Sequence, residues 1–132
     1  MDFGVLFVSP SLRDARLLAQ MLVELPLPLV HAASLHDATG KLAKGSFPVI
    51  LSEADLEDGN WLDALRLARS SDARLIVTRR SADAAFWAQA INLGAYDLLA
   101  QPFQKNEVLH VLSSASGGKI AMGGQRVLKA AG

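Results

Sequence analysis

The chain of 132 residues is 51% hydrophobic and 20% charged, which predicts one globular domain with a folded core. Thirteen basic residues balance thirteen acidic ones, so the sequence indicates no basic face for nucleic acid. Because the chain has no cysteine, disulfides, thiolate metal sites and cysteine nucleophiles are excluded.

Strand and helix patterns alternate five times along the chain. Short apolar runs without polar alternation indicate strands that are buried on both faces, as in a parallel sheet. We expect such strands at residues 3–8, 29–33, 49–52, 74–78 and 96–100.

Apolar residues at helical spacing predict a helix after each of these strands. Ser11 and Ser34 are suitable N-caps for the first two helices. Pro26 and Pro28 are expected to end the first helix, and Gly94 the fourth. The expected helices cover residues 12–25, 35 to about 45, 61–68, 84–93 and 106–115.

Five β–α units with short connections predict an α/β fold: a single doubly wound domain with a five-stranded parallel sheet, in the order 2-1-3-4-5, and five helices. This domain would take up residues 1–116. Residues 117–132 are rich in glycine and are expected to form a C-terminal tail. The tail is either flexible or forms a short helix over 125–131 that docks on the domain or on a partner.

In open α/β sheets, ligands gather just beyond the carboxyl ends of the strands. The residues at or near these ends are, in chain order, the acid Glu53, then Leu56-Glu57-Asp58-Gly59, Leu75-Ile76-Val77-Thr78, Leu93-Gly94-Ala95 and Leu98-Leu99-Ala100-Gln101-Pro102-Phe103. In this order they resemble the receiver domain of bacterial two-component response regulators, and the resemblance covers residues 3 to about 115. It implies a flavodoxin-like receiver fold and phosphorylation of an aspartate by a histidine kinase.

The sequence departs from the receiver pattern where a receiver holds its metal and its phosphoryl group. Ser9 and Pro10 stand at the positions of the acidic pair that binds Mg²⁺. Magnesium prefers carboxylate oxygens, so Mg²⁺ binding is not expected and no other cofactor is indicated. Glu53 stands at the phosphoacceptor position, where its extra methylene shifts the oxygen that would attack the phosphoryl group.

Two further positions differ and one is retained. Gln101 replaces the lysine that pairs with the phosphoryl group, and Leu98 replaces the aromatic switch residue. Thr78 keeps the hydroxyl of the family, although Arg79 follows it where receivers favour a small residue. We therefore interpret the chain as a degenerate receiver, or pseudo-receiver, with no catalytic residues.

The function expected from this resemblance is signalling in a two-component or phosphorelay-type pathway, independent of phosphorylation and exerted through protein contacts. One alternative is a sensor that binds a small neutral metabolite between Ser9, Thr78 and Gln101. A less favoured alternative is a conventional receiver that is phosphorylated on a displaced acid, Asp55 or Asp58.

The charge of Glu53 has two interpretations. It could imitate a phosphorylated aspartate permanently, or it could be a solvated acid without influence on conformation. Arg79 and Arg80 could form an ion pair with Glu53 in place of the lost lysine, or could be solvated side chains on a loop.

The helix at 84–93 is apolar nearly all round, although a helix on a sheet buries only one stripe. Phe86, Trp87 and Ile91 are therefore the candidate partner face, with Phe86 or Trp87 expected to stay exposed. In receivers, the fourth helix, fifth strand and fifth helix form the usual partner and dimer surface. The resemblance thus implies a protein partner, either a histidine kinase or a downstream regulator, and allows a homodimer.

The sequence does not indicate a metal site, a signal peptide or a membrane span. His31, His36 and His110 do not share metal-ligand spacing, so no metal is expected. The N-terminus lacks the basic region of a signal peptide, and no apolar run approaches the ~18 residues of a membrane span. We expect a bacterial, cytoplasmic protein that contacts neither membrane nor nucleic acid.

Overall fold

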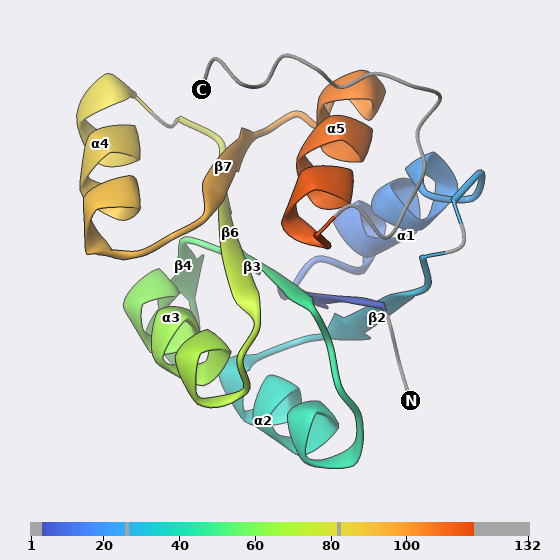
Figure 1. The fold of residues 1–132 in the computed structure, drawn as a ribbon, viewed down its shortest axis with the longest axis horizontal. Coiled ribbons are helices and arrows are strands. Elements are labelled where there is room, and N and C mark those ends of the chain that lie inside the picture. The colour runs from blue at the N-terminus through green and yellow to red at the C-terminus, as the bar shows by residue number, and fades with distance from the viewer. Residues whose placement is uncertain (1–3, 26, 82, 118–132) are drawn as a thin grey trace.

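The computed structural model describes residues 4–25, 27–81 and 83–117. Its main sheet contains five parallel strands in the order β2-β1-β3-β6-β7 (Figure 1). The predicted fold class and strand order are thereby confirmed. These strands are β1 (Val5–Val8), β2 (Leu29–Ala32), β3 (Val49–Glu53), β6 (Arg74–Arg79) and β7 (Asp97–Ala100).

Five helices connect or follow these strands, as the sequence predicts. Helices α1 and α5 lie together on one side of the sheet, and α2 and α3 on the other (Figure 1). Their bounds are α1 (Leu12–Met21), α2 (Leu35–Lys44), α3 (Trp61–Ser70), α4 (Ala84–Leu93) and α5 (Lys105–Ala115).

The predicted N-caps are confirmed, but the predicted end of the first helix is wrong. The hydroxyls of Ser11 and Ser34 each accept a hydrogen bond from the backbone N–H three residues ahead. Helix α1 ends at Met21, because the chain turns at Leu22 so that Leu22 and Leu27 can both enter the core. The other boundaries lie within two residues of those expected.

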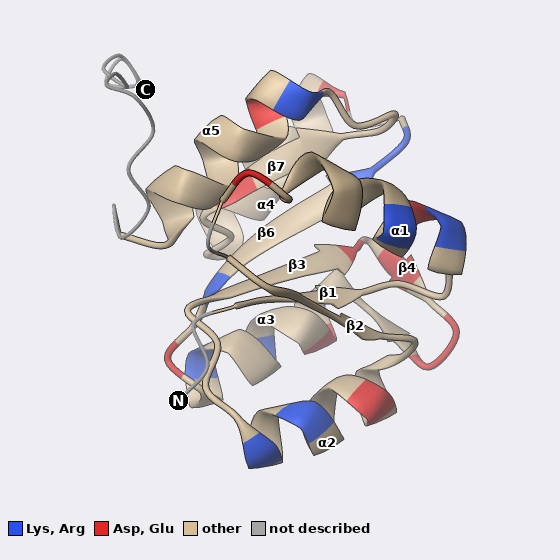
Figure 2. Cartoon of the chain, turned by 90° about the vertical axis from the view of Figure 1, so that its right-hand side faces the viewer, with Lys and Arg blue, Asp and Glu red and all other residues tan. Residues whose placement is uncertain are grey.

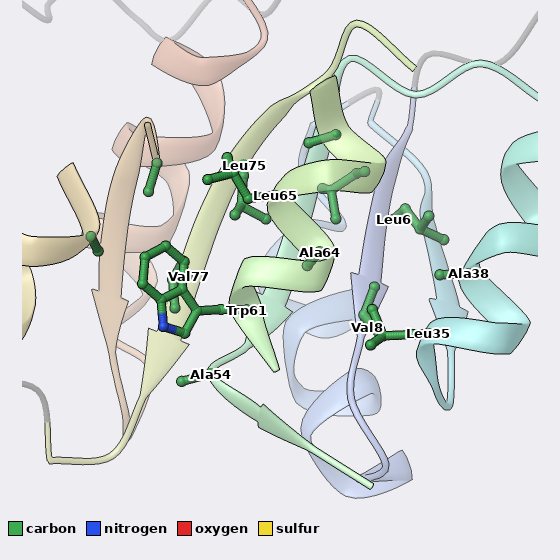
Figure 3. Close-up of a cluster of buried hydrophobic side chains, with 14 of the residues drawn as sticks. Leu6, Val8, Leu35, Ala38, Ala54, Trp61, Ala64, Leu65, Leu75 and Val77 are labelled. Atoms are coloured by element: carbon green, nitrogen blue, oxygen red, sulfur yellow. The ribbon is translucent and has the colours of Figure 1, made fainter. Parts of the chain in front are cut away.

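The central strands β1, β3 and β6 are buried on both faces because alternate residues enter two separate cores. One core lies under α1 and α5 and includes Phe7, Leu51 and Leu112. The other lies under α2, α3 and α4, where the ring of Trp61 packs beside Val77 (Figure 3). Strands that serve two cores can be covered only by helices on both sides.

A short antiparallel hairpin, β4 (Asp55–Leu56) with β5 (Gly59–Asn60), follows β3 where the sequence suggests only a loop. The Asp58 carboxylate between its strands accepts hydrogen bonds from the backbone N–H groups of Leu35 and His36, both at 3.0 Å. Asp58 thus caps α2 from outside and ties the hairpin to that helix.

Surface charge is mixed rather than sorted by sign. Acidic and basic residues are interspersed on α1 and α2 (Figure 2). Within the described part of the chain, no helix is both long and apolar enough to cross a membrane.

Candidate functional site

The carboxyl ends of four strands bring the sequence-predicted site residues to one face of the sheet. Ser9, Glu53, Thr78 and Gln101 each follow by two residues a side chain in the core under α1 and α5. Because side chains alternate along a strand, all four are placed on that same face. Glu53 pairs with Thr78 in the register of β3 and β6.

Glu53 is held by two neutral side chains. The hydroxyl of Ser9 donates a hydrogen bond to its Oε2 at 3.0 Å, and the Gln101 amide donates to the same oxygen at 3.4 Å. The Ser9 hydroxyl in turn accepts from the backbone N–H of Ser11 at 3.0 Å. The carboxylate is therefore fixed beside the start of α1 without a neutralising cation.

Thr78 takes no part in this network. The residue is fully buried, and its Oγ1 has no hydrogen-bond partner among the described residues. A buried hydroxyl without a partner is unfavourable and is uncommon in folded proteins. The hydroxyl that the receiver resemblance identifies is thus present but is not bonded to Glu53.

The magnesium ion that the receiver resemblance implies does not fit these residues. Ser9 uses its proton on Glu53, and Pro10 has no side-chain oxygen. Among the described residues, no group of three or more His, Asp or Glu side chains could hold a metal. Ser9 and Pro10 therefore supply no carboxylate beside Glu53, although carboxylates are the ligands that magnesium prefers.

Of the two interpretations of Arg79, an ion pair with Glu53 is not what the structure shows. The guanidinium of Arg79 lies over the ring of Phe86, 4.2 Å from its centroid, which is a cation–π contact. Arg80 lies near Glu53, but none of the ion pairs in the described part of the chain includes Glu53.

A pocket of about 570 Å³ opens beside Glu53, between the start of α1 and the loop after β7. Ser9 and Thr78 do not line it, because both are fully buried. Its lining combines side chains of both charges with the apolar residues Leu17, Pro102 and Phe103. The lining residues are Ser11, Arg13, Asp14, Leu17, Glu53, Arg80, Gln101, Pro102 and Phe103.

Leu98, at the switch position, is buried in the core under α2, α3 and α4, with 2% of its surface exposed. An aromatic switch residue can carry a polar group between core and solvent, whereas a buried leucine has no polar group to present. Leu98 is therefore an ordinary core residue.

Helix α4 buries little of its apolar surface. Ala90 is its one buried residue, while Phe86 is half-buried with its ring edge-on to Trp61 at 6.0 Å. Trp87 is exposed, which confirms that one of the two aromatic residues stays outside. The exposed large side chains of α4 and the residues just after it, here called the α4 surface, are Trp87 (46%), Ile91 (40%), Leu93 (44%) and Tyr96 (39%).

Two contacts near the site escape sequence reasoning. The Nε2 atom of His31 lies 2.7 Å from the backbone oxygen of Ser9, so a residue of β2 supports the loop after β1. Asp58 caps α2 rather than facing Glu53, and the two backbone hydrogen bonds that it accepts lower its pKa. Asp55 is exposed on the hairpin. Both contacts join residues more than twenty positions apart, for which a local pattern gives no signal.

Solved structures similar to this fold include receiver domains of response regulators. The signal receiver domain of an HD domain-containing protein from Pseudomonas fluorescens Pf-5 shares 25% identity, with a TM-score of 0.78 over 88% of each chain. A beryllofluoride-activated NtrC4 receiver domain dimer shares 26% identity, with a TM-score of 0.78 over 86% of this chain and 96% of that one.

The chemotaxis response regulator CheY4 of Vibrio cholerae is 18% identical and matches in fold, with a TM-score of 0.76 over 87% of this chain and 99% of the other. No protein-family model matches the sequence, and no curated protein matches it either. The similarity to these three structures is therefore carried by the fold and by 18–26% of the residues.

Proposed function

Since the chain has the fold of response-regulator receiver domains, we propose that it is a signalling domain of a two-component or phosphorelay-type pathway that acts without phosphorylation. Its output passes through protein contacts at the α4 surface. The domain holds one arrangement of the site, set by hydrogen bonds from neutral side chains rather than by a phosphoryl group.

The observation that carries this proposal is the Ser9–Glu53–Gln101 network. In-line phosphoryl transfer depends on a positioned nucleophile and on cations that neutralise the developing charge. Here Glu53 Oε2 already accepts hydrogen bonds from Ser9 and Gln101, and Arg79 is engaged with Phe86. Nothing in this network supplies the charge that transfer needs.

The α4 surface supports a protein partner. Exposed aromatic and large aliphatic side chains are the usual anchors of interfaces, and Trp is enriched among them. Trp87 and Ile91, one helical turn apart, are both exposed on a helix without a charged residue, and Leu93 is exposed near its end. A histidine kinase, a downstream regulator or a second copy of the chain would each gain from covering them.

The test is to expose the full chain to acetyl phosphate with Mg²⁺, and separately to beryllofluoride with Mg²⁺. Trp61 is a suitable reporter, because its backbone N–H bonds to Ala54, the residue after Glu53, at 2.9 Å. We expect no phosphoryl adduct by mass spectrometry and no saturable change in tryptophan fluorescence. An adduct on Glu53, Asp55 or Asp58 would overturn the proposal.

A variant with the receiver residues restored provides the matched control. The substitutions Ser9→Asp, Pro10→Asp, Glu53→Asp and Gln101→Lys return the acidic pair, the short acceptor and the lysine. This variant is expected to respond to Mg²⁺ and beryllofluoride under the same conditions. If the restored variant responds and the parent chain does not, the lack of response in the parent chain is due to these four positions.

A second candidate function, sensing of a small molecule, is favoured by the pocket beside Glu53. Its lining includes Arg13, Arg80, Asp14 and Glu53, so it suits a ligand with charges of both signs better than the neutral ligand first expected. Thermal shift of the full chain with a panel of zwitterionic metabolites tests this function. An equal shift in a Glu53→Gln variant would argue against the pocket.

A further inference from the structure

The pocket beside Glu53 contains four charged side chains, two of each sign, that do not pair with one another. Arg13 and Asp14 come from the start of α1, Arg80 from the loop after β6, and Glu53 from the end of β3. In the described part of the chain, none of the four takes part in an ion pair. The two signs of charge therefore stand apart around the pocket, where a ligand that carries both signs can satisfy them.

Three hydrogen-bond acceptors at the pocket have no donor among the described residues. Gln101 is only 8% exposed, and its amide N–H donates to Glu53 Oε2, which fixes the orientation of the amide and leaves its oxygen without a partner. The other oxygen of Glu53, Oε1, and the carboxylate of Asp14 likewise accept no hydrogen bond. A largely buried amide oxygen without a donor is unfavourable, so the site suits a donor from outside the chain. Three acceptors match the three N–H donors of a primary ammonium group.

The rest of the lining suits a carboxylate and an apolar group. A guanidinium, as in Arg13 and Arg80, binds a carboxylate through two parallel N–H donors. Leu17, one helical turn after Arg13 on α1, provides apolar surface together with Pro102 and Phe103. The volume of about 570 Å³ lies within the range of ~300–1,000 Å³ that is usual for small-molecule sites.

We propose that this pocket binds an α-amino acid with an apolar side chain. The ammonium group donates to the three acceptors, the carboxylate binds the two arginines, and the side chain contacts Leu17 and Phe103. An α-amino acid carries both charges on one carbon atom, and Arg13 and Asp14 are neighbours in the sequence that both line the pocket. This inference rests on the second candidate function, sensing of a small molecule, and names the chemical class of the ligand.

The experiment is isothermal titration calorimetry of the full chain with L-leucine and L-phenylalanine, and with three analogues that each lack one part of L-leucine. 3-Methylbutylamine lacks the carboxylate, 4-methylpentanoate lacks the ammonium group, and glycine lacks the apolar side chain. We expect L-leucine to bind at least about tenfold more tightly than each analogue, because each one loses charge-assisted hydrogen bonds or apolar contact.

Two variants identify the contacts. Arg80→Ala should remove most of the preference for L-leucine over 3-methylbutylamine, since the amine has no carboxylate to lose. Asp14→Asn should remove most of the preference over 4-methylpentanoate, which has no ammonium group. Arg16→Ala is the matched control, because Arg16 is an exposed arginine of α1 that does not line the pocket. This variant should bind L-leucine as the parent chain does.

Three results would overturn the proposal. One is equal affinity for L-leucine and an analogue without one of its charges, and another is binding that neither Arg80→Ala nor Asp14→Asn weakens. The third is a lack of binding of both L-leucine and L-phenylalanine at millimolar concentration. If glycine betaine, which has no N–H donor, binds in that third case, the sensing function stands and only the amino-acid assignment is wrong. The phosphorylation test of the proposed function is independent of all these outcomes.

Discussion

At the scale of single residues, the site depends on the hydroxyl of Ser9. Its hydroxyl is fully buried, donates to Glu53 and accepts from Ser11, so one atom joins the loop after β1 to β3. A hydroxyl can fill both roles, whereas an ionised carboxylate can only accept. Ser9 therefore bonds both Glu53 and the start of α1, which an ionised acid at this position could not do.

We predict that Ser9→Asp destabilises the domain by about 1–3 kcal/mol at neutral pH, because a buried acceptor then faces the acceptor Glu53 without a proton between them. Ser9→Asn is the matched control, since an amide keeps a donor at similar size. Urea unfolding of both variants at pH 7 measures the difference. Equal stability of the two variants would mean that charge repulsion at Glu53 is negligible.

Asp58 gives a prediction about pH. Hydrogen bonds from the Leu35 and His36 N–H groups favour its ionised form and hold its pKa below the ordinary value of 3.8. Its contribution to stability is therefore complete well above pH 3.8 and is lost as the pH falls through the lowered folded pKa. Asp58→Asn should lower the melting temperature at pH 7, with a difference from the parent chain that shrinks towards pH 3.

The control is Asp55→Asn, which removes an exposed carboxylate from the same hairpin. It should leave the melting temperature unchanged across this pH range. A pH-independent effect of Asp58→Asn would contradict the capping role.

Residue positions at the strand ends could be predicted because parallel strands end at one edge of the sheet. Ser9, Glu53 and Gln101 meet for this reason. The direction of Arg79 could not be predicted, since its rotamer depends on the ring of Phe86, which belongs to the next helix. Asp58 was likewise unpredictable, because its partners come from a different β–α unit.

At the scale of elements, α4 is held by one aromatic contact more than by burial. Phe86 lies between the Arg79 guanidinium and the edge of Trp61, while Ala90 is the one buried residue of the helix. Phe86 therefore joins α4 to both β6 and α3. Its neighbour Trp87 makes no contact of this kind among the described residues.

We predict that Phe86→Ala lowers the free energy of unfolding by about 1–3 kcal/mol, from the lost aromatic pair, cation–π contact and partial burial. Trp87→Ala should change it by no more than about 0.5 kcal/mol, as is usual for surface substitutions. Chemical denaturation measures both. A larger loss for Trp87→Ala than for Phe86→Ala would mean that the α4 surface is already packed in the isolated chain.

The C-terminal end of α1 could not be predicted from the sequence. Proline predicts that a helix cannot continue, but it does not predict how early the helix ends. Helix α1 ends at Met21 because core packing of Leu22 and Leu27 requires a turn. Capping is more local, and the predicted caps Ser11 and Ser34 are both present.

At the scale of the whole molecule, the fold was predictable because the strands are continuous apolar runs and the connections are short. Both features require a parallel sheet with helices on each side. The hairpin β4–β5 was not predictable, since its strands have two residues each and carry no periodicity. The residues that form the α4 surface could not be predicted either, because their exposure depends on which parts of α4 the elements α3 and β7 cover.

The two cores share the same strands, so we predict that they unfold together. Leu112 is fully buried under α1 and α5, on the opposite side of the sheet from Trp61. Leu112→Ala should lower stability by about 2–5 kcal/mol, the usual range for a buried leucine. Because neither face of the sheet can stay apolar and exposed alone, the midpoint of Trp61 fluorescence, read in a Trp87→Phe background, should shift as far as the circular dichroism midpoint.

Urea titration followed by both signals checks this, with Leu17→Ala on the partly exposed side of α1 as the control that should shift neither midpoint much. Coincident transitions are the mark of a single cooperative unit. If Leu112→Ala shifts the circular dichroism midpoint and leaves that of Trp61 in place, the two layers unfold independently. In that case a change near Glu53 could not reach the α4 surface through the shared sheet, and the output of the domain would have to pass through the loops.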